Sequence, residues 1–181
     1  MQTVVDSKNH FVVDAVTTND INDQSQLYSM AKNASELLEI DNTTVIADTG
    51  YYNVTDIKNY IDDSMTVYIK KAKANNKTKY NEFRKEKFAY KVDTDVYICP
   101  AGKEMSFFEN TSKNGMKYRK YKCQECSVCK YKNSCTTSAS GRTIQRWEHE
   151  DILESVHVET LNNNEIYKKR RCIVEHPFGT I

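Results

Sequence analysis

The sequence is poor in glycine and proline, with 5 and 2 of them in 181 residues. This scarcity excludes a collagen-like or low-complexity protein, because such chains are rich in those two residues. No apolar run approaches the roughly 18 residues of a membrane-spanning helix, so we expect no membrane segment. The amino terminus, MQTVVDSKNHFVVDAV, also lacks the basic-then-apolar order of a signal peptide. We therefore expect a cytoplasmic protein, whose cysteines stay reduced.

Charge is unevenly distributed, although the formal net charge is only +1. Residues 70–146 hold 19 Lys and Arg against 7 Asp and Glu, which gives this segment a charge of +12. The flanks are acidic, with −8 over residues 1–69 and −3 over residues 147–181. A basic segment between acidic flanks is typical of a module that binds a polyanion. A solvated, lysine-rich surface would have the same composition, so charge alone does not decide between them.

The order of patterns along the chain predicts an α/β fold. Two β-rich runs joined by the polar stretch SKN indicate a hairpin within residues 3–17. Apolar residues at helical spacing follow over 27–38, then an apolar strand at 44–47, a helix capped by Asn53, and a strand at 66–69. This order is typical of a mixed sheet flanked by helices.

Helical patterns return only after residue 147, which suggests that one domain is interrupted. The intervening segment contains a probable-hairpin pattern in FAYKVDTDVYICP, with DTD at its turn, and then a cluster of cysteines. We therefore interpret residues 1–69 and 147–181 as two parts of one core. Residues 70–146 are then a basic, cysteine-rich insertion.

Five of the six cysteines lie between positions 99 and 135, mostly within CQECSVCKYKNSC. A structural zinc ion takes four thiolate or imidazole ligands in a tetrahedron. The basic segment has no histidine, so a zinc site within it would need four cysteines. We choose as ligands Cys99, Cys126, Cys129 and Cys135, with Cys123 as the substitute. Four thiolates would leave no open position for catalysis, and the alternative is a set of reduced cysteines that only pack.

Two carboxylates are candidates for chemistry. Asp48 follows the strand at 44–47, and α/β sheets usually hold their sites at the carboxyl ends of strands. An aspartate there also suits a turn or a helix cap. Glu175 lies four residues after Arg171 on a predicted helix, a spacing that by itself indicates an ordinary surface ion pair. If Asp48 and Glu175 met, they could hold divalent cations for phosphoryl transfer, but spacing does not show that they meet.

Several stretches together resemble a known family: ADTGYY, YICPAG, CxxCxxxxxC, RTIQRWEHE and YKKRRCIVEHPFGTI, in this order. The chain resembles the bacterial insertion-sequence DDE transposases, and most of all the branch with a cysteine-rich insert before the last catalytic helix. This resemblance covers nearly the whole chain. It implies a ribonuclease H-like fold, a mixed sheet flanked by helices, and catalysis with magnesium ions. Asp48 matches the A-D-x-G-Y motif, and Glu175 matches the tyrosine–arginine–glutamate–lysine signature with Tyr167 and either Arg170 or Arg171.

The chain departs from the family pattern at both ends. The family's first catalytic aspartate lies on a strand upstream of the first hairpin, so Asp6 and Asp14 are poor substitutes for it. The closing lysine of the signature would fall at position 182. We therefore expect a partial catalytic domain, a truncated fragment that is inactive by itself.

The resemblance implies that the intact enzyme is a homodimer that cuts DNA at transposon ends and joins the 3′-hydroxyl to a target. In such an enzyme Tyr167 would pack or contact DNA, and the arginine would bind phosphate or fix Glu175. The basic segment is the expected DNA-contacting surface, through Lys117, Arg119, Lys120 and Lys122. Two alternatives are a non-enzymatic, zinc-stabilised DNA-binding module and a ribonuclease H-like nuclease.

Overall fold

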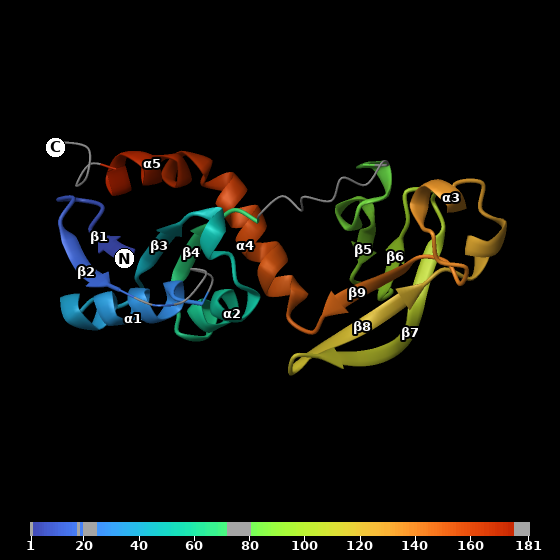
Figure 1. Cartoon of the computed structure of the whole chain (residues 1–181), viewed down its shortest axis with the longest axis horizontal. Coiled ribbons are helices and arrows are strands. Elements are labelled where there is room, and N and C mark those ends of the chain that lie inside the picture. Colours follow the sequence, from blue (N-terminus) through green and yellow to red (C-terminus); the bar gives the residue numbers. More distant parts are fainter. Residues whose placement is uncertain (1, 18, 20–24, 72–80, 176–181) are drawn as a thin grey trace. The chain divides into compact units, whose positions relative to one another are not determined.

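The computed structural model describes residues 2–17, 19, 25–71 and 81–175, with the side chains of residues 81, 174 and 175 left out. The chain forms two compact units (Figure 1). Unit 1 comprises residues 1–73 and 151–181, and unit 2 comprises residues 74–150. Helices and strands occur in both units, so the mixed α/β class expected from the sequence is confirmed. Among the described helices, none has the length and apolar composition needed to cross a bilayer.

Unit 1 contains two pairs of strands. β1 (Gln2–Val5) pairs antiparallel with β2 (Val12–Val16), as the hairpin pattern predicts. β3 (Thr44–Ala47) pairs in parallel with β4 (Thr66–Ile69), so that Ala47 lies opposite Ile69. Parallel strands require a crossover connection, and α2 (Val54–Asp62) provides it. The side chain of Asn53 caps this helix, as expected, by accepting the N–H groups of Thr55 and Asp56.

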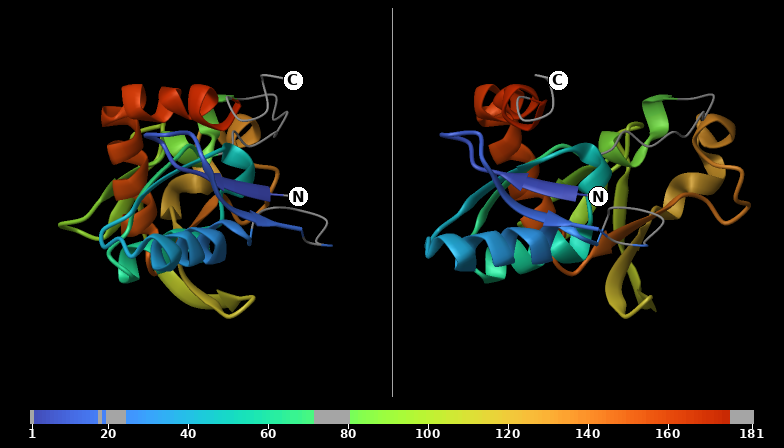
Figure 2. Two further views of the ribbon diagram at one scale, coloured as in Figure 1. Left: turned by 90° about the vertical axis from the view of Figure 1, so that its left-hand side faces the viewer. Right: turned by 60° about the vertical axis from the view of Figure 1, so that its left-hand side comes forward.

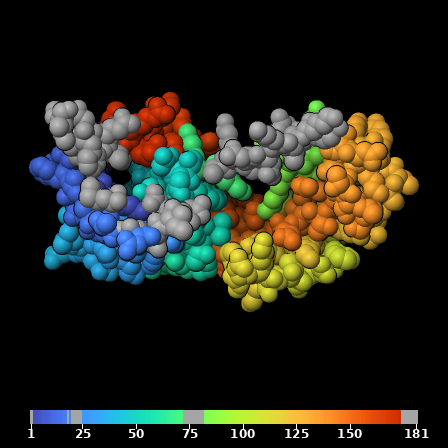
Figure 3. Space-filling view, viewed as in Figure 1, coloured from blue at the N-terminus to red at the C-terminus, as the bar shows by residue number. Residues whose placement is uncertain are grey.

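Helices enclose the strands of unit 1. α1 (Leu27–Leu38) packs against the β1–β2 hairpin, which lies directly on it in the space-filling view of Figure 3. After α4 (Glu150–Asn162), α5 (Asn164–Glu175) runs on the side of the strands opposite α1, as both views in Figure 2 show. The core of the unit consists of apolar side chains from these elements: Met30, Ala31, Ala34, Ile57, Tyr60, Val67, Ile69 and Val156.

The carboxyl-terminal helices are attached at the end of β4. The hydroxyl of Thr160, a fully buried residue of α4, accepts the N–H of Ile69 at 3.2 Å and donates to the carbonyl of Val156 at 2.7 Å. The Lys70 ammonium donates to the Asn164 side chain at 2.9 Å and lies 4.4 Å from the centroid of the Tyr167 ring. The segment 151–175 is therefore joined to the first part of the chain by buried polar contacts.

Unit 2 is a five-stranded antiparallel sheet with its strands in sequence order. They are β5 (Ala89–Lys91), β6 (Val96–Ile98), β7 (Glu104–Lys113), β8 (Met116–Lys122) and β9 (Thr143–Trp147). A short helix, α3 (Lys132–Cys135), and 3₁₀ turns at Asn81–Phe83, Lys85–Lys87 and Gln124–Val128 complete the unit. The sequence predicted only the β5–β6 hairpin and missed β7, β8 and β9. The pair Asn114–Gly115 was the available signal, because both residues have positive φ (52° and 77°), as a tight hairpin turn requires.

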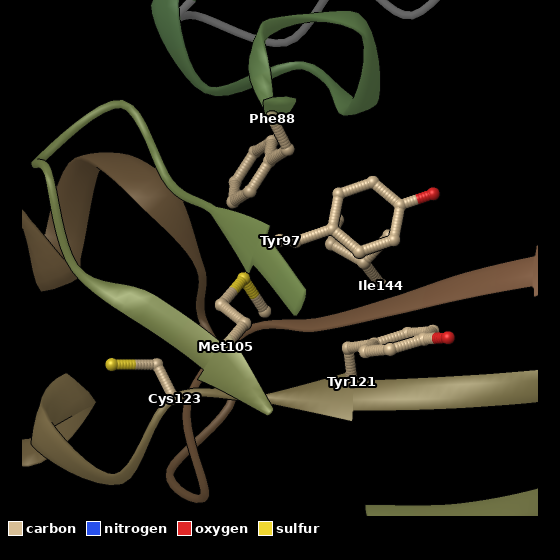
Figure 4. Close-up of a cluster of buried hydrophobic side chains, with 6 residues drawn as sticks. All are labelled: Phe88, Tyr97, Met105, Tyr121, Cys123 and Ile144. Atoms are coloured by element: carbon tan, nitrogen blue, oxygen red, sulfur yellow. The ribbon is translucent and has the colours of Figure 1, made fainter. Parts of the chain in front are cut away.

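The core of unit 2 gathers six buried side chains (Figure 4): Phe88, Tyr97, Met105, Tyr121, Cys123 and Ile144. Asp95 organises the polar edge of this core. Its Oδ1 accepts the hydroxyls of Tyr90 at 2.7 Å and Tyr121 at 2.6 Å, and its Oδ2 accepts from Arg119 at 2.5 Å. Burial acts to raise the pKa of Asp95, but these hydrogen bonds and the Arg119 charge outweigh it, so that the pKa lies below its usual range.

Replacing Asp95 by Asn should destabilise the folded chain in a pH-dependent way. Asparagine tolerates the positive φ of 52° at this position, so the change mainly removes the charge. The folded-state pKa is lowered, so the stabilisation exists above the unfolded pKa near ~4 and disappears as pH falls through the folded pKa. We expect a loss of about 1–2 kcal/mol at pH 7, measured by denaturant unfolding, and a smaller loss at about pH 3. Asp93→Asn, an exposed position in the same turn, is the control; equal losses in both variants would contradict the prediction.

Candidate active site

Asp48 lies immediately after β3, at the carboxyl end of the strand. Its Oδ1 accepts the N–H of Thr49 at 2.7 Å and so caps the 3₁₀ turn Thr49–Tyr51. Its Oδ2 lies 3.3 Å from Nη1 of Arg170. The Asp48 side chain is 52% exposed. The carboxylate therefore serves as a turn cap with one oxygen, and its other oxygen faces a cation and solvent.

Arg170 reaches Asp48 from α5. Its side chain is only 21% exposed, and its guanidinium carbon lies 5.7 Å from the centroid of the Tyr167 ring, one turn earlier on the helix. Tyr167 is buried, and burial raises the pKa of its hydroxyl. Arg171 is exposed. Of the two arginines that fit the predicted signature, Arg170 is thus the one that contacts the carboxylate of Asp48.

Glu175 is the last residue of α5, and its side chain lies outside the described residues. Its backbone follows Arg170 by five residues, which is about 7.5 Å along a helix axis. The helix that carries Glu175 contacts β3, the strand that precedes Asp48. Whether the two carboxylates meet stays a prediction. The expected HPFGTI stretch, residues 176–181, also lies outside the described part.

Lys70 is a residue of this region that sequence reasoning placed elsewhere. We assigned it to the beginning of the basic insertion, yet it follows β4 directly and contacts Asn164 and Tyr167 within unit 1. The available signal was its position one residue after an apolar strand, which is equivalent to the position of Asp48 after β3. The site therefore combines one carboxylate with two cations, Lys70 and Arg170, on either side of Tyr167.

The five cysteines of unit 2 gather around one small cavity of about 30 Å³, which we call the cysteine cavity. They are Cys99, Cys123, Cys126, Cys129 and Cys135, and all are free thiols. Burial raises the pKa of the Cys123 and Cys135 thiols, which favours their protonated form. Within the described residues, no three Cys, His, Asp or Glu side chains are placed closely enough to hold a metal ion. The structure thus brings the predicted zinc ligands to one cavity without arranging them as a metal site.

Backbone geometry around the cysteine cavity is specific. The Sγ of Cys99 accepts the N–H of Lys103 at 3.4 Å, a contact that orients this sulfur. Gly141 has φ +91°, and a Cβ placed there would lie 2.6 Å from Cβ of Cys126 and 3.1 Å from its Sγ. A real Cβ could not approach so closely, so glycine is required where this loop passes Cys126.

The four predicted DNA-contacting residues lie along β8. Three of them have acidic partners: Lys120 donates to Glu109 at 2.6 Å, Arg119 to Asp95 at 2.5 Å, and Lys117 lies 4.0 Å from Glu148. Lys122 instead lies 5.4 Å from the ring centroid of Phe108, an exposed aromatic residue at an irregularity in β7. The hairpin therefore presents cations beside an exposed ring, although most of these charges are already paired.

One comparison with known proteins bears on the identity of the chain. Residues 98–181 match the family model described as transposase DDE domain, which supports a DDE transposase with a partial catalytic domain. The match includes the cysteines, Tyr167, Arg170 and Glu175, whereas Asp48 lies before it. The resemblance predicted from the sequence motifs is thereby confirmed. No curated protein and no solved structure matches the chain.

Proposed function

We propose that this chain is part of the catalytic domain of an insertion-sequence DDE transposase, which transposes DNA by cleaving and rejoining its strands. The contact that carries this proposal is the one between Arg170 and Asp48. It links the ADTGYY motif, which precedes the family match, to the YKKRRCIVE motif inside it. Two sequence signatures of one family therefore contribute to one site.

The fold proposed for unit 1 is ribonuclease H-like. Its order of hairpin, strand, helix, strand and terminal helices agrees with that fold, and unit 2 corresponds to a cysteine-rich insertion. We assign residues 1–69 and 147–181 to the core and 70–146 to the insertion, with Lys70 functionally part of the core because of its contacts. The first catalytic aspartate and the closing lysine would lie outside this sequence. The chain alone should therefore be inactive.

Magnesium is the metal that suits the proposed site, because it prefers oxygen ligands and keeps several waters. Asp48 and Glu175 would hold it, since a half-exposed carboxylate at a strand end retains free lone pairs for an ion. When bound, magnesium would make water or a 3′-hydroxyl a better nucleophile and stabilise charge on the leaving oxygen. Arg170, packed beside buried Tyr167, would orient the carboxylate of Asp48. Exposed Arg171 would be available for a DNA phosphate.

The cysteine cavity is proposed as a structural zinc site. Its small volume and five convergent thiols suit one ion, with Cys99, Cys126, Cys129 and Cys135 as ligands and Cys123 as the substitute. Zinc binding would displace the thiol protons and draw four sulfurs together. Four thiolates would complete the coordination, so this ion would stabilise unit 2 and take no part in catalysis.

DNA is the proposed partner, and the β7–β8 hairpin is the proposed contact surface. Paired lysines can exchange their acidic partners for phosphates, and an exposed aromatic ring can stack on a base. A non-enzymatic DNA-binding module is the alternative that a specific observation favours, because unit 2 has its own compact core. DNA binding that survives loss of Asp48 and Glu175 would support the module, and strand transfer would separate a transposase from a nuclease. The intact enzyme would act as a homodimer in the cytoplasm.

The catalytic proposal predicts that the carboxylates of Asp48 and Glu175 lie within about 4–8 Å of each other, close enough to share or bridge metal ions. A protein completed with the upstream aspartate strand and the downstream lysine should cleave and join DNA with magnesium. Asp48→Ala and Glu175→Ala should each abolish this activity in a strand-transfer assay. Asp62→Ala, which removes a surface carboxylate paired with Lys58, should not. An experimental structure with the two carboxylates more than about 12 Å apart would contradict the assignment.

The zinc proposal predicts about one zinc ion per chain in protein purified without chelator. Metal analysis should show its loss in the double variant Cys126→Ser, Cys129→Ser. The variant Gly141→Ala should also bind zinc more weakly, because its Cβ would displace Cys126. Cys172→Ser, at an exposed position of α5, is the matched control and should retain the ion. Wild-type protein without zinc, or a double variant that keeps it, would overturn the proposal.

The DNA proposal predicts affinity that falls steeply with salt and depends little on sequence. Replacing Lys117, Arg119, Lys120 and Lys122 by Ala should flatten the plot of log affinity against log salt by up to about 0.9 per lost contact. Removing Lys8 and Lys58 of unit 1 provides a charge-change control, and this variant should leave the slope unchanged. The same slope in the four-residue variant as in the wild type would mean that DNA binds elsewhere.

A further inference from the structure

Unit 1 contains a groove of about 450 Å³ that lies beside its strands. Consecutive residues of two strands line it, Thr3–Val5 of β1 and Thr44–Ile46 of β3. Successive side chains of a strand point to opposite faces of a sheet, so an opening over one face would meet alternate residues only. An opening lined by consecutive residues therefore lies at the strand edges, in the plane of the strands.

Both strand edges at this groove lack a neighbouring strand in the described part of the chain. β1 is paired with β2 alone, and β3 with β4 alone, which leaves two separate two-stranded sheets. β4 contributes nothing to the lining of the groove, and β2 contributes only Val13. The outer edges of β1 and β3, with their rows of backbone donors and acceptors, therefore border the same space.

Two helices cover the groove from opposite sides, as Figure 2 shows for α1 and α5. α1 presents one face to it, through Leu27, Ala31, Ala34 and Leu38. α5 presents Ile166, Arg170 and Ile173, also at helical spacing. The walls above and below the plane of the strands are thus mostly apolar. The two alanines leave room there for the side chains of an occupant.

Arg170 is the charged exception on the α5 wall. One of its terminal nitrogens contacts Asp48, but its buried Nε has no hydrogen-bond partner in the described part of the chain. A buried donor without a partner is unfavourable, and an acceptor on an occupant would satisfy it. The groove therefore has backbone groups on two sides, apolar walls above and below, and one cation that favours an acidic neighbour.

We infer that this groove binds an extended peptide strand from outside this sequence, apolar on both faces and carrying one acidic side chain toward Arg170. Such a strand would pair with β1 on one edge and with β3 on the other, and so join the two sheets into one. Because helices cover both faces, its sequence should be a continuous apolar run with no alternation of polar residues. The inference uses neither DNA nor metal chemistry, so it is tested separately from the proposed function.

The test uses the whole chain and a fluorescent probe peptide, Lys-Val-Ile-Val-Asp-Val-Ile-Val-Lys. Fluorescence anisotropy should show saturable one-to-one binding, and hydrogen exchange should show new protection of amides in both β1 and β3. A matched peptide with N-methyl groups on alternate residues keeps the side chains but loses one row of backbone donors. A second has Lys in place of Asp. Each should bind at least about tenfold more weakly, because hydrogen bonds or a charge pair are lost.

Protein variants locate the binding site. Ile173→Lys places a charge on the α5 wall and should weaken binding at least about tenfold. Val158→Lys, at an exposed position of α4 outside the groove, should have no effect. If Ile173→Lys fails to fold by circular dichroism, the comparison of the peptides on the wild-type chain decides. Equal affinity for the N-methylated peptide, unchanged affinity in a folded Ile173→Lys, no binding at roughly 1 mM peptide, or a peptide-free dimer by light scattering that the peptide does not dissociate would each overturn the inference.

Discussion

The constraint on which unit 1 depends is the return of residues 151–175 to the edge of β3 and β4, after the separate sheet of unit 2. The contact between Arg170 and Asp48 lies at the point where this return brings the two motifs together. A half-exposed ion pair contributes only about 0–1 kcal/mol, so it does not hold α5 in place. Buried Thr160 and the contacts of Lys70 with Asn164 and Tyr167 attach the helices more firmly. Packing therefore positions α5, and the ion pair orients the carboxylate.

Arg170 has a part in both proposals that concern unit 1. Its guanidinium contacts Asp48 at the end of β3, and it also lines the α5 side of the groove between β1 and β3. A strand bound in that groove would therefore end or pass close to the carboxylate that we propose for metal binding. Completion of the sheet and completion of the catalytic site would then be the same structural event, because both require an acceptor beside Arg170.

Unit 2 explains part of the unusual tyrosine content, 12 residues against a single tryptophan. Tyr90, Tyr97 and Tyr121 pack with ring centroids 5.0, 5.1 and 6.1 Å apart. Two of their hydroxyls reach Asp95, which also accepts from Arg119. Phenylalanine would fill the same space but would leave this carboxylate with fewer donors, so tyrosine suits a core that includes a charged group. The thiols of the cysteine cavity pack against the same core, so ordering of the cavity and stability of the sheet should be coupled.

The sequence by itself determined the local elements of unit 1 and the family. Hairpin, strand and cap patterns act over a few residues, and for that reason 44–47, 66–69 and the Asn53 cap could be predicted. The long β7–β8 hairpin was also open to local reasoning through Asn114–Gly115, but the basic composition of its strands obscured the pattern. Only the tertiary structure decided that Arg170 is the arginine at Asp48, that Lys70 belongs to this site, and that five cysteines line one cavity. Each of these depends on which face of a helix or strand is buried and against what, and packing between distant segments sets that choice.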